Sequence, residues 1–303
     1  MPNEYRFFTT DVFTNRMFGG NQLAVFTDAR GLDSATMQKI AREMNLSETV
    51  FVLPPQTTRG TRGVRIFTPD RELPFAGHPT VGTAFVLAAI GEVTATGETA
   101  CIVLEEGVGP VEVLIRFDGA QPTFAELTTA KLPEEGPPAP AVELLAAALS
   151  LDAAQLLDGD RRPRAFSCGV PFLFVTVRDL KALAQARPNL ALWERHLTGY
   201  ITNEIYLITE DAGDVDVRAR MFAPSLGIME DPATGSAASA LAGYLAPAQS
   251  VDRTFRWKIL QGVEMGRPST IQVEADVQAG AITAVRVGGS AVMVSEGVLR
   301  LPS

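Results

Sequence analysis

Apolar and polar residues alternate along most of this chain in short runs, and this pattern predicts a mixture of strands and helices. In the first half, strands are expected at 5–12, 23–26, 46–53, 64–68, 101–104, 111–117 and 124–127. A helix is expected at 34–44, because an apolar residue returns there every three or four positions. A second apolar run of helical composition covers 81–90.

The second half has a similar pattern after 132–140, a segment rich in proline and acid that we interpret as a linker. Helices are expected at 142–149, 153–157, 181–186 and 190–197, and an Ala-rich helix ends at Leu245. Strands are expected at 164–177, with an interruption at 169–171, and at 254–260, 271–275, 282–287 and 292–295. We therefore expect a first lobe at 1–130 and a second at 131–288.

Part of the first half is repeated in the second. Arg65-Ile66-Phe67-Thr68-Pro69 returns 155 positions later as Arg220-Met221-Phe222-Ala223-Pro224, and residues 47–53 align with 202–208 at the same offset. Further on, Gly77-His78 aligns with Gly235-Ser236 at an offset of 158. A strand, a second strand, a loop and a helix in each half indicate duplicated lobes. A chance match of short apolar segments is the alternative.

Each repeated loop leads into the start of a helix. Pro79, just inside the first of these helices, and the small residues before it are signals of a helix N-terminus. The free backbone N–H groups of Gly77 and His78 then lie at the positive end of the helix, which suits a carboxylate. Two such ends facing one cleft would hold one small acid.

Composition limits the possible partners. The chain has 303 residues, a formal net charge of −9, 46% hydrophobic and 20% charged residues. Nucleic acid is an improbable partner for so acidic a chain, and no apolar run approaches the roughly 20 residues of a membrane span. With only two cysteines, Cys101 and Cys168, neither a disulfide framework nor a thiolate metal site is expected. These features and the lack of an export signal fit the cytoplasm.

Glu48 is the main candidate for chemistry. In the strand at 46–53, alternation puts it on the same side as Leu46, Val50 and Val52. A buried carboxylate is costly unless it is paired, so its pKa should rise. The alternative is a glutamate on an edge strand that reaches solvent.

Other candidates lie at the two repeated loops. His78 can hydrogen-bond a ligand or relay a proton, or it can be structural. Asp231 can act in the site or only cap the second helix, and Ser236 can contact a ligand or simply start that helix. Cys168 can be a reactive thiol, but a small buried apolar residue is the better interpretation. His196 is expected on the surface.

The two halves differ in a way that bears on the reaction. At an offset of 155, Glu48 aligns with Asn203, and neither loop carries a cysteine, since Ala76-Gly77 and Thr234-Gly235 stand there. A two-base racemase needs a proton acceptor on each face of the substrate carbon. A single base predicts an isomerase, which takes a proton from one carbon and returns it elsewhere.

The chain resembles the PhzF-like family of phenazine biosynthesis, a branch of the diaminopimelate epimerase fold. The segments that carry this resemblance are Phe18–Val25, Met44–Thr49, Pro74–Pro79, Glu230–Ala237, Gln261–Ser269 and Gly288–Val292. It implies α/β (α+β) lobes, each a mostly antiparallel sheet rolled around a central helix, a C-terminal strand at about 289–303 that crosses back to the first lobe, and a homodimer. Gln22 departs from the family, which usually has proline there.

The resemblance also implies an activity. A characterised member isomerises a dihydro-hydroxyanthranilic acid without metal or organic cofactor. By resemblance, Glu48 is the acid/base, His78, Asp231 and Ser236 hold and polarise the substrate, and Ser47, Gly77 and Gly235 line the site. We therefore expect a cofactor-independent isomerase of a small, cyclic carboxylic acid. An epimerase with an unrecognised second base and a binding protein without catalysis are the alternatives. The substrate itself and any phenazine pathway cannot be read from the chain.

Overall fold

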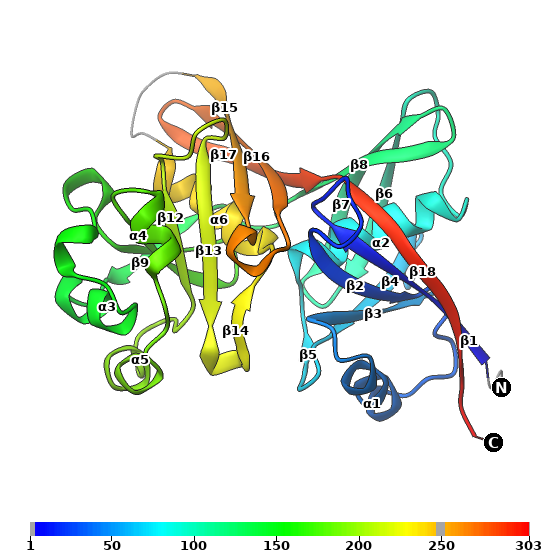
Figure 1. Ribbon diagram of the computed structural model, residues 1–303. Coiled ribbons are helices and arrows are strands. Elements are labelled where there is room, and N and C mark those ends of the chain that lie inside the picture. The colour runs from blue at the N-terminus through cyan, green and yellow to red at the C-terminus, as the bar shows by residue number, and fades with distance from the viewer. Residues whose placement is uncertain (1–3, 247–251, 303) are drawn as a thin grey trace. The chain divides into compact units, whose positions relative to one another are not determined.

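The structure is a computed structural model that describes residues 4–246 and 252–302 (Figure 1). The chain divides into two compact units. Unit 1 consists of Met1–Ala130 and Gly288–Ser303, and unit 2 of Lys131–Val287. Each unit is a mixed α/β structure with more sheet than helix, as predicted.

Unit 1 is a sheet with one buried helix. Its elements are β1 (Glu4–Val12), β2 (Asn21–Phe26), α1 (Ser34–Met44), β3 (Glu48–Leu53), β4 (Arg62–Phe67), β5 (Glu72–Leu73), α2 (Gly77–Ala89), β6 (Thr99–Glu106), β7 (Gly109–Asp118), β8 (Gln121–Thr128) and β18 (Ala291–Arg300). All residues of α2 from Gly77 to Ala88 are buried, against β1, β2, β7 and β8. Helix α1 packs on the other face, where Met37 and Ile40 join a cluster with Phe26, Phe51 and Phe67.

Unit 2 repeats this order from β10 onward, with two helices in place of α1, and has β9 and α3 before it. Its elements are β9 (Glu134–Pro138), α3 (Val142–Ala148), β10 (Arg164–Ser167), β11 (Pro171–Thr176), α4 (Leu180–Gln185), α5 (Leu190–Leu197), β12 (Ile205–Thr209), β13 (Val217–Ala223), β14 (Ile228–Asp231), α6 (Gly235–Leu245), β15 (Arg253–Gln261), β16 (Ser269–Gln278) and β17 (Ala281–Gly289). Helix α6 is almost wholly buried and contacts β9, β10, β11 and β16. It is the counterpart of α2.

The pairing of strands confirms the duplicated fold. In unit 1, β1 and β2 are antiparallel, β2 and β3 parallel, β3 and β4 antiparallel, and β4 and β6 parallel. In unit 2, β10 and β11, β11 and β12, β12 and β13, and β13 and β15 repeat that sequence of orientations. Each unit thus places a short strand, β5 or β14, directly before its buried helix.

The strand register corrects one alignment made from the sequence. Arg62 pairs with Leu104 and Val217 with Ile259, so β4 and β13 are offset by 155 as predicted. Val50, however, lies opposite Ile66, and Tyr206 lies opposite Met221, the counterpart of Ile66. The offset between β3 and β12 is therefore 156.

Successive residues of a strand point to opposite sides. Shifting the alignment by one residue therefore changes which side chains of β12 lie on the same face as the side chains of β3. Phe51 and Leu207, which become equivalent, both pack in the cluster beneath the outer helices of their own units. The counterpart of Glu48 is then Glu204, not Asn203. The prediction that the second half has no acid at this place is wrong.

Two element predictions also need correction, those of the linker and of the helix at 153–157. The expected linker contains β9, which pairs with β10, and prolines are tolerated in such an exposed strand. Helix α2 starts at Gly77, where the signals around Pro79 placed its N-terminus. Residues Ala153–Gln155 form only a 3-10 turn. Among the helices of the described residues, none has the length and apolar character that a membrane crossing requires.

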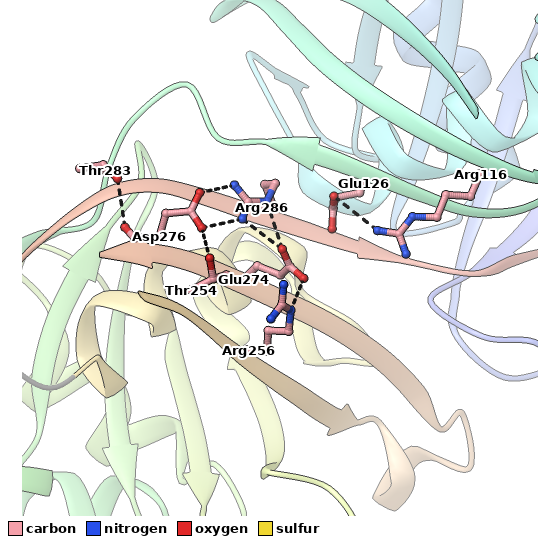
Figure 2. Close-up of polar contacts among 8 residues, drawn as sticks. All are labelled: Arg116, Glu126, Thr254, Arg256, Glu274, Asp276, Thr283 and Arg286. Atoms are coloured by element: carbon pink, nitrogen blue, oxygen red, sulfur yellow. Dashed lines mark hydrogen bonds and ion pairs between the residues drawn. The ribbon is translucent and has the colours of Figure 1, made fainter. Parts of the chain in front are cut away.

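Strands β15, β16 and β17 carry a network of charged side chains (Figure 2). Arg286 contacts both Glu274, at 3.0 Å, and Asp276, at 2.7 Å, and Arg256 also contacts Glu274, at 2.7 Å. The bonds from Arg286 and then from Thr254 lower the pKa of Asp276 to about 2. The network therefore stays ionised at neutral pH and ties the three strands together across one face.

Candidate active site

Glu48, His78 and Asn21 come together in unit 1. Glu48 is the first residue of β3, His78 lies in the first turn of α2, and Asn21 is the first residue of β2. His78 Nε2 lies 3.2 Å from Glu48 Oε2, and the Asn21 side-chain nitrogen lies 3.3 Å from His78 Nδ1. Their exposed fractions are 9% for Glu48, 4% for His78 and 0% for Asn21. The carboxyl of Glu48 is thus inside the unit and does not reach solvent in the manner of an edge strand.

The environment keeps the His78 ring neutral. Burial lowers the pKa of His78 to about 3, and a hydrogen bond with the backbone of Gln22 acts in the opposite direction. A neutral imidazole has one nitrogen that donates and one that accepts. His78 can therefore hydrogen-bond to Asn21 through one ring nitrogen and to Glu48 through the other without becoming a cation.

The N-terminus of α2 is shaped by its own sequence. Ala76 is the N-cap in an extended conformation and has no polar side chain with which to cap the helix. Pro79 has no N–H, and the Thr80 N–H bonds the Ala76 carbonyl. The helix also runs very close to the sheet, since a Cβ on Gly82 would come within 2.6 Å of Leu23 and Val12 side chains. The first N–H groups of α2, those of Gly77 and His78, are left for another acceptor.

A hydrogen-bonded network surrounds Asp231 in unit 2. Asp231 ends β14 and is 7% exposed, and its carboxylate accepts a bond from the Thr234 hydroxyl at 2.5 Å. The side-chain amide of Gln261 donates to the Asp231 carbonyl at 2.8 Å and to the Thr234 hydroxyl at 3.0 Å. Tyr206 donates to the Gln261 side-chain oxygen at 2.9 Å. Burial, followed by the nearby charge of Asp231, raises the pKa of Tyr206.

This network determines the position of Asp231. Because Tyr206 keeps its proton, Gln261 is oriented with its oxygen toward Tyr206 and its nitrogen toward Asp231. Thr234 is the N-cap residue of α6, but within the described residues its side chain makes no capping bond, since the hydroxyl goes to Asp231.

The structure places the remaining predicted residues as follows. Ser47 is half-buried immediately before Glu48, Gly77 is buried as the first residue of α2, and Gly235 is buried as the first residue of α6. Ser236 follows in the first turn of α6 and is half-buried. Ser47, Glu48, Gly77 and His78 thus belong to unit 1, and Asp231, Gly235 and Ser236 to unit 2.

Four residues that support these groups were not assigned roles from the sequence: Asn21, Tyr206, Thr234 and Gln261. Asn21 follows two glycines at the start of a strand, which is a detectable signal. Gln261 reaches Asp231 only because β15 lies parallel to β13, with Gln261 opposite Ala219. Cys168 is half-buried, and burial raises the pKa of its thiol to about 12, so it is protonated at neutral pH.

Comparisons with known proteins agree on one family. A sequence model of the family described as phenazine biosynthesis-like protein matches residues 10–297. An uncharacterized isomerase of Mesorhizobium japonicum is 41% identical over 299 residues, which cover 95% of this chain and 96% of that protein. The trans-2,3-dihydro-3-hydroxyanthranilate isomerase of Pseudomonas aeruginosa is 36% identical over 295 residues, 97% of this chain and 98% of that protein. The crystal structure of a Bacillus anthracis phenazine biosynthesis protein of the PhzF family superposes with a TM-score of 0.88 at 27% identity, covering 99% of this chain and 100% of that one.

Proposed function

The chain is an isomerase that belongs to the phenazine biosynthesis-like protein family, and we propose that it moves a proton on a small cyclic carboxylic acid with Glu48 as its single acid/base. The observation that carries the proposal is the buried carboxyl of Glu48, 3.2 Å from a neutral His78 at the start of α2. The substrate class is suggested by the name of the relative from Pseudomonas aeruginosa.

In this mechanism Glu48 removes a proton from one carbon of the substrate and returns it to another. A general base of this kind contributes about 10²–10⁴-fold to the rate. Negative charge builds up on the substrate while the proton is on Glu48. His78, Asp231 and Ser236 hold and polarise the substrate, and the N–H groups of Gly77 and Gly235 stabilise its negative charge, as donors at helix N-termini do elsewhere. No metal or organic cofactor is part of the proposal.

The substitution Glu48→Gln tests the proposal. Glutamine keeps the shape and one acceptor oxygen but cannot take a proton, so turnover of trans-2,3-dihydro-3-hydroxyanthranilate should fall by at least about 10²-fold. Binding should change little, because the contacts to the substrate carboxylate are elsewhere. The reaction is followed in D2O by NMR, and affinity by calorimetry. Glu112→Gln, the same change at an exposed position of β7, serves as the control.

Normal turnover by Glu48→Gln would show that another group is the base. Tight binding by the unchanged protein of a panel of cyclic carboxylic acids, without exchange of any substrate proton, would instead identify a binding protein that has no catalytic activity.

One observation favours a second candidate, an epimerase. The strand register makes Glu204 the counterpart of Glu48, and its carboxylate accepts a bond from the Thr202 hydroxyl. A second base in unit 2 could deliver a proton to the opposite face of the substrate carbon. If so, Glu204→Gln should lower turnover as strongly as Glu48→Gln, and the product formed in D2O should carry deuterium with inverted configuration. Retained activity in Glu204→Gln argues for the single base.

The proposal also includes a homodimer, as the family resemblance implies, and a location in the cytoplasm, as the composition of the chain suggests. Light scattering on the purified chain, at several concentrations, measures its oligomeric state. A monomer at all concentrations that retains full turnover would remove the dimer from the proposal.

A further inference from the structure

Glu106 is a buried acid that the proposed mechanism does not use. It is the last residue of β6 and is 8% exposed. Its Oε1 lies 2.7 Å from the Thr80 hydroxyl of α2, and its Oε2 is sealed from solvent, with no hydrogen-bond partner among the residues that the structure describes. The chain just after it lies close to the residue that follows β5, since a Cβ on Gly107 would lie 2.8 Å from the Pro74 Cα.

The contacts of Thr80 show which group carries the proton. The Thr80 hydroxyl oxygen lies 2.8 Å from the Ala76 carbonyl oxygen and 2.7 Å from Glu106 Oε1. Two oxygen–oxygen contacts this short need a proton each, and the hydroxyl has only one. The carbonyl cannot donate, so Thr80 donates to Ala76. The other proton must then belong to Glu106, which donates to Thr80.

Burial is consistent with this assignment. Desolvation raises the pKa of Glu106 to about 8. His78, the titratable residue of α2, is neutral, and Glu112 of β7 is exposed. The other charged groups on the surrounding elements are engaged with other residues: Glu105 with the backbone at Gln56 and Thr57, Arg65 with Glu72, Arg62 with Glu92, and Arg116 with Glu126.

We propose that Glu106 is a positioning residue, held neutral against Thr80 so that the N-terminus of α2 is left free to attract the substrate's carboxylate. Thr80 and Ala76 belong to the first turn and the N-cap of that helix. An anion within the first turn offsets the partial positive charge of a helix N-terminus. Ionised Glu106 would compete in this way with an anionic ligand at Gly77 and His78, whereas the neutral acid does not. This inference rests on the proposed function, which puts the substrate's acid at those groups.

Infrared spectroscopy tests the protonation state without any substrate. The difference spectrum between the unchanged protein and Glu106→Gln at pH 7 should contain the carbonyl band of a protonated carboxyl. In Thr80→Val that band should shift, because the acid loses its acceptor. Absence of the band, or no shift in Thr80→Val, would overturn the inference. Thr80→Val gives a second result if Glu106→Gln fails to fold.

Ligand binding tests the consequence. The probe is 3-hydroxyanthranilate, the aromatic analogue of the relative's named substrate, and its Kd is measured by calorimetry between pH 6 and pH 9. The Kd of the unchanged protein should rise about fivefold as Glu106 ionises, and the Kd of Glu106→Gln should stay level. Glu105→Gln, the neighbouring substitution, should behave like the unchanged protein.

Identical Kd profiles in the unchanged protein and Glu106→Gln, or no binding by either, would overturn the inference. Turnover separates this result from the proposed function: a chain that binds the probe with the expected profile but does not isomerise the dihydro acid supports the role of Glu106 and refutes the proposed reaction.

Discussion

At the scale of single residues, the properties of His78 follow from where it is held. A histidine in water has a pKa near neutrality and is the usual pH-sensitive residue. Here burial lowers the pKa of His78 to about 3, well below the ordinary histidine value of 6.5. The folded chain therefore has no proton on this ring at pH 5, whereas the unfolded chain does.

This difference predicts a pH dependence of stability. A depressed histidine pKa means that the unfolded state binds more protons, so stability is lost as pH falls from about 6.5 toward 3. His78→Gln should flatten this part of the curve of unfolding free energy against pH, measured by urea denaturation. His196→Gln, at the half-buried histidine of α5, is the control. A curve as steep in His78→Gln as in the unchanged chain would contradict the assignment.

At the scale of elements, each unit has one arginine that fastens its short strand before the buried helix. Arg65 of β4 bonds Glu72 of β5 through two contacts of 2.7 and 2.6 Å. Arg220 of β13 bonds Glu230 of β14 through two contacts of 2.8 and 2.7 Å. Arg220 also donates to the carbonyls of Leu183 and Ala186 at the end of α4. The same arginine–glutamate ion pair is thus half-exposed in unit 1 and buried in unit 2.

The two ion pairs should contribute differently to the free energy of unfolding. The Arg220 side chain is 3% exposed and that of Arg65 is 27% exposed. Removing one partner of a buried pair leaves a charge unpaired and costs about 3 kcal/mol, while an exposed pair is worth up to about 1 kcal/mol. Arg220→Met should therefore lower the free energy of unfolding by about 3 kcal/mol, and Arg65→Met by about 1 kcal/mol or less. Equal losses, measured by chemical denaturation, would count against burial as the cause.

Elements also show how far the sequence pattern can predict the structure. The positions of most strands, the two buried helices and the burial of Glu48 followed from apolar spacing, whereas the short strands β5, β9 and β14 did not. The counterpart of Glu48 did not, because residues 46–53 and 202–208 are apolar on both faces. In a strand buried on both sides, alternation is too weak to determine register, and a one-residue error exchanged Glu204 for Asn203. Only the pairing of Tyr206 with Met221 fixed it.

The surroundings of the candidate residues were predictable to a similar depth. Glu48 is a glutamate on the apolar side of a strand and His78 is a histidine at the start of a helix, and both patterns are visible in the sequence. Gln261 and Tyr206 contact each other although they are 55 positions apart. That contact depends on which strands become neighbours, and no local pattern contains this information.

At the scale of the whole molecule, unit 1 is built from two separate parts of the chain. Strand β18 pairs with β1 from Glu4 opposite Arg300 to Val12 opposite Ala291, and this pairing includes the Arg6–Glu296 ion pair at 2.8 Å. Unit 2, in contrast, is a single continuous segment.

Removing residues 291–303 should therefore affect the units unequally. Strand β1 would become an exposed edge with unpaired N–H and C=O groups, which favours aggregation. Amide hydrogen exchange should accelerate along β1 and β2, while β12 and β13 of unit 2 keep their protection. Equal acceleration in both units would show that they do not fold independently.

The pairing of β1 with β18 also orders events during synthesis. Strand β1 can pair with β2 early, but almost the entire chain must be translated before its second neighbour, β18, exists, whereas residues 131–287 contain the strands of their own unit. At translation rates of about 5–20 residues per second, that delay lasts on the order of tens of seconds. We expect the nascent chain to depend on chaperones over its first strand, and slow translation to extend that dependence.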